Sequence, residues 1–305
     1  FVFPRLDAGA CIRCGRCKQV CGFQRGLGQV AGERSYAAAT VEGQIERSAS
    51  GGIFGALARA TIARGGVVFG CAYEQGEDGL LVRHRAARTE GELEGLYGSK
   101  YVQSSALACF GEVERELRAG REVLFSGAPC QVAGLRGYLG RSYDGLLTVD
   151  IVCHGVPSER MLREYLRGLE GSGARVTDAR FRPKRDGWSE SLQLELVRTD
   201  GARTCVPSGR SSYYDCFLRL ETLRDSCYAC PFAGPLRPGD LTIGDFWGIE
   251  EVRPDLLDDA GGPFSLRRGV SCLLVNTDAG ARWLEELGEK IARESVAFED
   301  VALRN

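Results

Sequence analysis

Apolar runs of strand length alternate with helical patterns along the first half of the chain. In residues 53–64, four apolar side chains recur near one face, which predicts a helix that the following glycine pair ends. The later runs are short and bounded by turn residues, as buried strands are. Strands are predicted at residues 67–73, 81–85, 123–126 and 146–152, and further helices at 106–118 and 158–170, the last with Ser158 as its N-cap.

From about residue 175 the pattern changes to alternating apolar and polar positions. It predicts half-exposed strands at residues 180–183 and 192–197, followed by a turn at Thr199-Asp-Gly201. Beyond them we expect a helix at 213–224, a strand at 241–243 and a late helix at 283–291. The predicted fold class is therefore α/β with α+β elements: a mixed, partly parallel sheet core with flanking helices.

Composition sets the scale of the molecule and excludes some partners. The chain has 305 residues, 44 % hydrophobic and 26 % charged, enough for a substantial core and more than one lobe. Its net charge of −2, without a long basic run, argues against nucleic acid and anionic membranes. No uninterrupted apolar run reaches the roughly 18 residues of a membrane span. Thirteen cysteines indicate metal in a reducing compartment, so we expect a cytoplasmic protein.

The densest chemical signal is a run of four cysteines near the start of the chain. Its spacing is C-x2-C-x2-C-x3-C, and its members are Cys11, Cys14, Cys17 and Cys21. Thiolates at this spacing can wrap one [4Fe–4S] cluster, although in bacterial ferredoxins the fourth cysteine often serves a second cluster. Zinc is the alternative, but structural zinc sites usually pair two separated C-x2-C knuckles. We therefore predict a ferredoxin-like cluster arm over residues 1–30, with the role of Cys21 open.

Four further cysteines are dispersed along the chain. Cys130 and Cys153 each follow a predicted strand, and Cys227 and Cys230 form a C-x2-C pair. Strand ends of an open α/β sheet lie at the rim where ligands bind, so three loops meeting there would supply four thiolates. The alternative is that Cys130 and Cys153 are small buried apolar residues, as most lone cysteines are. The cysteines expected only to pack are Cys71, Cys109, Cys205, Cys216 and Cys272.

Two polar turns are candidate anion sites. Ser50-Gly-Gly52 leads directly into the helix predicted from residue 53, so free N–H groups at the helix end can bind a pyrophosphate. A glycine before a helix is also ordinary turn chemistry. The stretch Gly98 to Ser104 holds one cation, Lys100, which can meet phosphate or a reduced flavin, or can be a solvated loop lysine. No G-x-G-x-x-G follows a strand, so a Rossmann-type site is not supported.

Two histidines and one basic loop complete the candidates. His84 lies between arginines in a predicted strand, and we expect it to be exposed. His154 follows Cys153 and can relay a proton to a cofactor or simply hydrogen-bond the backbone. The basic-aromatic loop at residues 182–188 can take an anionic acceptor or be a solvated turn. No Ser-His-Asp set or paired carboxylates stand out, so hydrolysis is not favoured.

Together these stretches resemble the coenzyme F420 hydrogenase/dehydrogenase beta-subunit family, from the cysteine arm to about residue 300. The matching motifs are Ser48-Ala-Ser-Gly-Gly52, Gly65-Gly-Val-Val-Phe-Gly70, Gly98-Ser-Lys-Tyr-Val-Gln-Ser104, Phe125-Ser-Gly-Ala-Pro-Cys-Gln131, Asp150-Ile-Val-Cys-His-Gly-Val-Pro-Ser158, Cys227-Tyr-Ala-Cys230 and Asp240-Leu-Thr-Ile-Gly-Asp-Phe-Trp-Gly248. The resemblance implies an FAD-containing iron–sulfur oxidoreductase that passes electrons between two [4Fe–4S] clusters and the flavin. The flavin would exchange hydride with a two-electron carrier or small-molecule substrate.

The resemblance also implies site residues. The inner cluster would take Cys130, Cys153, Cys227 and Cys230, with iron as the metal. The flavin would be lined by Ser50, Gly51, Gly52, Gly98, Ser99, Lys100, Tyr101, Gln103 and Ser104. Lys100 is expected to touch the flavin, and Lys100 and His154 are the expected catalytic residues. Residues 45–170 would form the flavin-binding half, and residues 171–305 would complete the inner cluster and the substrate site.

The expected partners are redox partners. An electron donor or acceptor protein, such as a ferredoxin or a partner redox subunit, would dock at the arm, and the acceptor would be a small molecule or a deazaflavin. The motifs around Cys153 and Trp247 resemble a bacterial-type subfamily that differs from the deazaflavin-reducing hydrogenase subunits, so the family name does not set the substrate. The alternatives are a non-catalytic electron relay and a zinc-stabilised accessory protein of polysaccharide biosynthesis.

Overall fold

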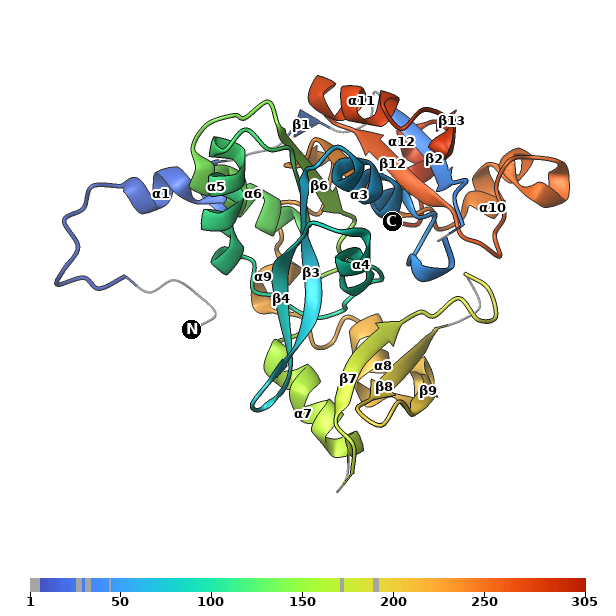
Figure 1. Ribbon diagram of the computed structural model, residues 1–305, viewed down its shortest axis with the longest axis horizontal. Coiled ribbons are helices and arrows are strands. Elements are labelled where there is room, and N and C mark those ends of the chain that lie inside the picture. Colours follow the sequence, from blue (N-terminus) through green and yellow to red (C-terminus); the bar gives the residue numbers. More distant parts are fainter. Residues whose placement is uncertain (1–5, 26–28, 31–33, 44, 171–172, 189–191) are drawn as a thin grey trace.

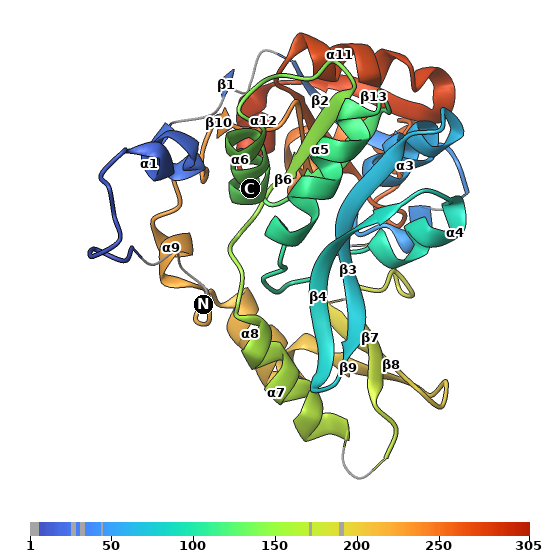
Figure 2. The same ribbon diagram turned by 60° about the vertical axis from the view of Figure 1, so that its left-hand side comes forward.

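The computed structural model describes residues 6–25, 29–30, 34–43, 45–170, 173–188 and 192–305. Figures 1 and 2 show a large sheet with helices on its faces, a smaller sheet below it and the N-terminal arm at one side. The strands are β1 (Gln29–Val30), β2 (Ser35–Thr40), β3 (Val67–Gly76), β4 (Gly79–Ala87), β5 (Val123–Gly127), β6 (Leu146–Ile151), β7 (Val176–Phe181), β8 (Gln193–Arg198), β9 (Arg203–Pro207), β10 (Leu236–Arg237), β11 (Leu241–Asp245), β12 (Ser271–Val275) and β13 (Ile291–Val296). The α-helices are α1 (Arg16–Val20), α2 (Gly22–Arg25), α3 (Ile53–Ala63), α4 (Glu90–Leu93), α5 (Phe110–Arg118), α6 (Pro129–Leu139), α7 (Glu159–Glu170), α8 (Ser212–Leu218), α9 (Asp225–Tyr228), α10 (Ile249–Val252), α11 (Asp278–Glu285) and α12 (Phe298–Ala302).

Eight strands of the described ranges form the main sheet, in the order β13-β2-β12-β11-β6-β5-β3-β4. The four central strands β11, β6, β5 and β3 run parallel to one another, and the remaining neighbours are antiparallel. The predicted fold class, a mixed and partly parallel sheet with flanking helices, is confirmed. The register places Asp150 of β6 beside Gly127 of β5 and Thr242 of β11, so these strands end at one edge.

The central strands follow the apolar runs of the sequence. The strands predicted at 67–73, 81–85, 123–126, 146–152 and 241–243 are present as β3, β4, β5, β6 and β11. The structure adds a strand that was not predicted between the arm and Ser48: β2 lies there and pairs with both β12 and β13. Ala37 and Ala38 of β2 are fully buried, but alanine has a low strand propensity and gives little signal.

Two predicted helices have different bounds in the structure. The helix predicted at 213–224 ends at Leu218, where Leu220 takes a positive φ of 59° that an α-helix does not tolerate. The helix predicted at 283–291 is α11, which begins earlier because the Thr277 hydroxyl accepts from the Gly280 N–H and caps it. Ile291 belongs instead to β13, opposite Thr40.

Helices cover both faces of the parallel part of the sheet. Alternate residues of β3 point to opposite faces, so Val68 packs in a cluster with α3, whereas Val67 and Phe69 pack with α5 and α6. The first of these clusters also includes Trp283 of α11. A further cluster around Phe246 packs α10 and α12 against β2 and β12. Both faces are therefore buried, as a parallel sheet requires.

A smaller lobe surrounds the far end of the long β3–β4 hairpin, as Figure 2 shows. Its sheet has the order β7-β8-β9, and α7 and α8 pack against it. The strand predicted at 192–197 corresponds to β8. The strand predicted at 180–183 has other bounds, because β7 begins earlier and ends at Phe181. The turn predicted at residues 199–201 joins β8 to β9. Leu80 and Val82 of the hairpin belong to the same core as Phe181 and Tyr213, so the far end of the hairpin is packed into the smaller lobe.

The N-terminal arm lies against α6. A Cβ on Gly22 would stand 2.7 Å from the Ala133 Cβ, and a Cβ on Gly137 would stand 2.1 Å from the Val20 carbonyl oxygen, so glycine permits the contact on both sides. Beyond the arm, β1 pairs with β10. Figure 1 shows α1 at the outer side of α5 and α6, away from the smaller lobe.

Candidate functional site

A cavity of about 1150 Å³ opens at the C-terminal ends of the parallel strands. Residues at or just beyond the ends of β5, β6 and β11 line it, among them Ala128, Cys153 and Asp245. Ligands of open α/β sheets bind at this edge, because the loops there are free of the sheet hydrogen bonding. The cavity is therefore the candidate site.

Most of the predicted cofactor residues line this one cavity. It takes in Ser50, Gly52, Gly98, Ser99, Lys100, Tyr101, Gln103 and Ser104 of the expected flavin site, and Cys130, Cys153 and His154 of the expected cluster side. His154 is exposed beside Cys153, and its catalytic role stays a prediction. Cys71, expected only to pack, also reaches the cavity.

The Ser50-to-Gly52 turn presents the start of α3 to the cavity. Gly52 has a φ of +83° and caps α3 without a side-chain hydrogen bond, so the first N–H groups of α3 have no side-chain partner there. Gly51 does not line the cavity. Its N–H donates to Ser271 Oγ at 2.9 Å, and a Cβ would lie 2.4 Å from the Ala38 carbonyl oxygen. Glycine at 51 is thus a packing requirement of the sheet edge.

Lys100 is neither a solvated lysine nor a free cation. Its ammonium donates to the carbonyl oxygens of Gly95 at 3.0 Å and Tyr97 at 2.7 Å, which closes the loop before it. Burial lowers the pKa of Lys100 from its usual value. Lys100 still lines the cavity, so a contact with a bound group remains compatible with this loop-closing role.

The expectation that His84 is exposed is wrong. The ring is 5 % exposed and stacks on Phe125 at 5.3 Å. Its Nε2 lies 3.0 Å from the Ser126 carbonyl oxygen, which accepts only from a protonated nitrogen, so Nδ1 accepts from the Ser104 hydroxyl at 3.1 Å. The Gln131 amide donates to Ser104 Oγ at 2.9 Å. This chain of bonds ties the loop ending at Ser104 to α6.

His84 makes the stability of the fold sensitive to acid. Burial lowers the pKa of His84 to about 4, from about 6.5 in the unfolded chain. Between these values only the unfolded chain binds the proton, so the free energy of unfolding should fall by roughly 3 kcal/mol as pH drops from 6.5 to 4. Urea unfolding of the wild type and His84→Gln across this range measures it. We expect a flatter profile for the variant, and parallel profiles would contradict the assignment.

The four dispersed cysteines, Cys130, Cys153, Cys227 and Cys230, lie near one another and are called the inner thiols below. Cys130 keeps surface exposed to the cavity, yet the protein atoms around it desolvate the thiol and raise its pKa to about 12. The other three thiols add to this rise as like-charged neighbours. Burial also raises the pKa of Cys153, with Cys227 and Cys230 acting in the same direction. Thiolates that repel one another are stabilised by a shared cation, so these positions suit a metal centre.

The donor set matches cluster chemistry in type. Within the described ranges, no three His, Cys, Asp or Glu side chains converge tightly enough for a single metal ion. In a four-iron cluster each iron takes its own thiolate, so the sulfur atoms stand further apart than around one zinc ion. Four thiols are soft ligands of the kind that iron–sulfur clusters use. The cluster itself stays a prediction.

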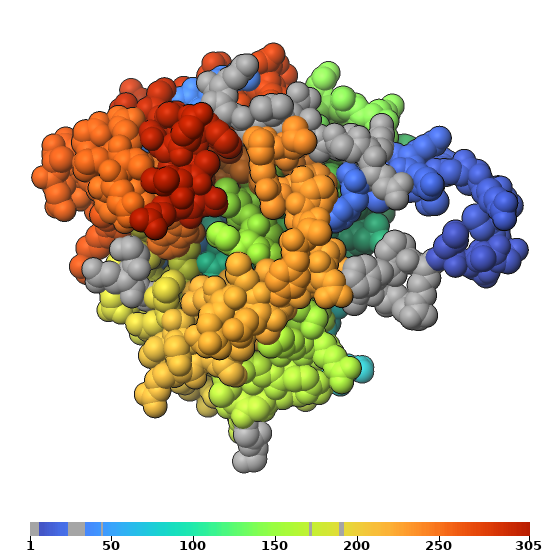
Figure 3. All heavy atoms as spheres, turned by 180° about the vertical axis from the view of Figure 1, so that it is seen from behind, coloured from blue at the N-terminus to red at the C-terminus, as the bar shows by residue number. Residues whose placement is uncertain are grey.

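The end of the arm packs against the segment that follows Cys230. Cys14 and Cys17 are exposed, and Cys11 and Cys21 are partly exposed. Two residues beyond Cys21, Phe23 packs edge-on against Phe232 at 5.5 Å, and Phe232 follows Cys230 by two residues. In Figure 3 the segment around residues 225–240, in orange, crosses the back of the molecule toward the blue arm.

The basic-aromatic loop at residues 182–188 is mostly engaged within the protein. Arg182 is 4 % exposed, pairs with Asp245 and lies over the Trp247 ring at 4.6 Å. The Lys184 ammonium donates to backbone carbonyls, including that of Ile45 at 2.9 Å, and burial lowers its pKa to about 7. The loop is therefore not an open basic surface, although Arg182 lines the cavity.

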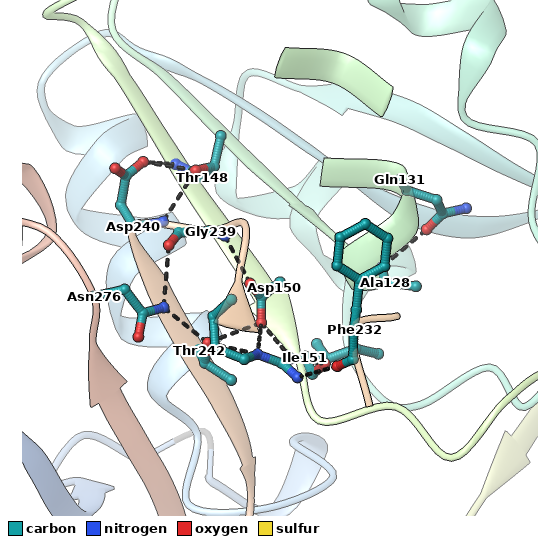
Figure 4. Close-up of polar contacts among 11 residues, drawn as sticks. Ala128, Gln131, Thr148, Asp150, Ile151, Phe232, Gly239, Asp240, Thr242 and Asn276 are labelled. Atoms are coloured by element: carbon teal, nitrogen blue, oxygen red, sulfur yellow. Dashed lines mark hydrogen bonds and ion pairs between the residues drawn. The ribbon is translucent and has the colours of Figure 1, made fainter. Parts of the chain in front are cut away.

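One buried network was not expected from the sequence. Arg237 is paired with Asp150. The Thr242 hydroxyl donates to Asp150, and the amide of Asn276, just beyond β12, donates to Thr242, as Figure 4 shows. Asp150 begins the motif that carries Cys153, but Arg237 follows Cys230 by seven residues in a segment without periodicity. No sequence signal distinguishes it from a surface arginine.

Comparisons with known proteins agree with this architecture. A chain of the F420-reducing [NiFe] hydrogenase complex from Methanosarcina barkeri, from a study of its xenon derivatization, is similar with a TM-score of 0.57. The two share 15 % identity over 89 % of this chain and 84 % of the other, so the likeness concerns the fold. A search of curated proteins finds no match. Among the described residues, no helix combines the length and apolar character needed to cross a bilayer.

A comparison of the sequence with protein-family models assigns the chain to a family. Residues 120–300 match the family model that describes the C terminus of the coenzyme F420 hydrogenase/dehydrogenase beta subunit. This span includes the inner thiols, the strands β5, β6 and β11 that position the cavity, and the smaller lobe. The chain therefore belongs to the coenzyme F420 hydrogenase/dehydrogenase beta-subunit family, a family of redox subunits.

Proposed function

We propose that this chain is an iron–sulfur flavoprotein oxidoreductase, with one [4Fe–4S] cluster on Cys11, Cys14, Cys17 and Cys21, a second on the inner thiols, and FAD in the cavity. The observation that carries the proposal is that one cavity joins the predicted flavin residues to Cys130 and Cys153. A flavin beside a thiol-rich wall can exchange single electrons on one side and a hydride on the other.

Each part of the chain has a task in this proposal. The uncapped start of α3 offers N–H groups to a pyrophosphate, and the loop from Gly98 to Ser104 borders the ring side of the cavity. Two electrons from a one-electron donor, plus one proton, equal the hydride that a two-electron acceptor takes, and the bound flavin supplies this conversion. His154, exposed at the cavity, is placed to hold that proton.

The arm is the proposed docking point for the electron donor or acceptor protein. Its cysteines are at least partly exposed, and Phe23 at its end packs against Phe232, in the segment that follows Cys230. The similar chain from Methanosarcina barkeri is part of a hydrogenase complex, which supports a partner redox subunit or a ferredoxin in this role. The proposed acceptor is a small two-electron carrier, of which a deazaflavin is one candidate.

An anaerobic absorption spectrum with metal analysis tests the proposal. We expect flavin bands together with about eight irons per chain, four for each cluster. A broad cluster absorption without flavin would instead indicate an electron relay. A colourless protein that contains zinc would indicate the accessory role and would overturn the redox assignment.

A further inference from the structure

A single buried guanidinium joins the two segments that carry Cys153 and Cys230. Arg237 lies in β10 and is 6 % exposed. Its Nη1 donates to the Phe232 carbonyl oxygen at 2.9 Å, two residues after Cys230. Its Nη2 donates to the Ile151 carbonyl oxygen at 2.8 Å, two residues before Cys153. The Arg237 side chain thus sets the distance between the end of β6 at Ile151 and the loop that contains Phe232, two segments that are distant in sequence.

Asp150 holds this guanidinium in place. The carboxylate is fully buried and accepts from Arg237 Nη2 at 2.5 Å and from Nε at 3.1 Å. It also accepts from the Gly239 N–H at 2.7 Å and the Thr242 hydroxyl at 2.8 Å. In Figure 4 the bonds from Asp150, Thr242, Ile151 and Phe232 meet at one point between the segments.

The two segments are tied at both of their ends. At the end away from Arg237, the Arg224 N–H donates to the Val156 carbonyl oxygen at 3.1 Å. Cys153 therefore lies between tied positions on one segment, and Cys227 and Cys230 lie between tied positions on the other. The segments approach closely there, because a Cβ on Gly155 would stand 3.2 Å from the Cys227 Cβ.

Only arginine has the geometry for this contact. Its planar fork carries five N–H donors, so one side chain can reach two carbonyls and a carboxylate in fixed directions. A lysine has one nitrogen and cannot span Ile151 and Phe232 in the same way. The observed bonds use all three guanidinium nitrogens, Nε, Nη1 and Nη2.

We propose that Arg237 is a positioning residue of the inner metal centre, which fixes the distance between the thiol of Cys153 and those of Cys227 and Cys230. This inference rests on the proposed function, since it assumes that the inner thiols hold a cluster. Partners that orient metal ligands without touching the metal often tune its affinity and potential. Arg237 acts from this outer position and is distinct from the ligands.

The test compares Arg237→Gln and Arg237→Lys with the wild type, as the full chain purified without oxygen. Iron content, electron paramagnetic resonance of the reduced protein and a redox titration are measured, and the cluster of the arm serves as an internal reference. For both variants we expect one of two results. Either the electron paramagnetic resonance signal of the inner cluster disappears and about half of the iron is lost, or the reduction equilibrium of the inner cluster shifts at least tenfold, which is 59 mV for one electron. The signal of the arm should be unchanged.

Arg136→Gln is the matched control. Arg136 lies on α6, which also carries Cys130. It donates to Thr148 Oγ1 at 2.8 Å and pairs with Asp240 at 2.9 Å, and these two partners lie outside the segments of Cys153 and Cys230 that Arg237 joins. Arg136→Gln should lower the midpoint temperature of thermal unfolding, but it should not change the electron paramagnetic resonance signal of the inner cluster. The inference fails if the Arg237 variants behave like this control. An iron-free wild type would overturn the proposed function as well, so the two failures are distinguishable.

Discussion

Cys227→Ser is expected to reduce the iron content from about eight to about four atoms per chain and to stop reduction of the flavin by a one-electron donor. Cys227 lies near Cys130 and Cys153 and raises the pKa of both as a like-charged neighbour, and a serine hydroxyl is a poor ligand for iron in a cluster. The cluster of the arm should remain, because its cysteines belong to a separate segment. Iron analysis and anaerobic stopped-flow absorption measure both effects.

Cys205→Ser is the control for this experiment. Cys205 lies in β9 of the smaller sheet and does not line the cavity. Its replacement should leave iron content and flavin reduction unchanged, so any loss in Cys227→Ser can be assigned to the inner centre. Normal iron content and normal reduction in Cys227→Ser would show that the inner thiols do not hold the second cluster.

Asp150→Ala is expected to lower the free energy of unfolding by about 3–5 kcal/mol. The carboxylate is the buried partner of Arg237, and its removal leaves a guanidinium uncompensated in the interior. The Gly239 N–H and the Thr242 hydroxyl lose their acceptor as well. Urea unfolding monitored by circular dichroism at neutral pH measures the change.

Asp255→Ala tests whether this loss depends on burial. Asp255 pairs with Arg253 at 2.8 Å, but its side chain is 61 % exposed, so water replaces the lost contact. Its replacement should leave the unfolding midpoint almost unchanged. If the two variants were equally stable, the buried pair of Asp150 and Arg237 would not be a determinant of the fold.

The central strands and most helices could be predicted because their signals are local. The apolar runs of β3, β5 and β6 are continuous, as expected for strands buried on both faces. β12 is also a short buried apolar run, which was not identified as a strand. The strands β2 and β13 give little local signal and are placed by pairing across the sheet. Ala37 of β2 lies opposite Cys272 and Glu294, which are more than two hundred residues away in sequence.

In the site, too, the features with local sequence signals could be predicted and those that depend on long-range contacts could not. Cysteine spacing and the glycine turns indicated which segments carry chemistry, and most of these segments meet at one cavity. The burial of His84 could not be anticipated, because its partner Ser126 lies 42 residues away on another strand. Gly51 was expected at the cofactor but packs under the turn instead, which depends on the distant Ala38 and Ser271.

By itself the sequence determined the family, the parallel core and the eight cysteines with ligand-like spacing or context, since each depends on residues close together in the chain. Only the tertiary structure decided which thiols lie together and what holds their segments. Arg237 in β10 and Asp150 in β6 are 87 residues apart, so their pairing depends on how these distant segments pack and not on any local pattern. Long-range packing sets such distances because a buried charge is stable only where its partner is already in place.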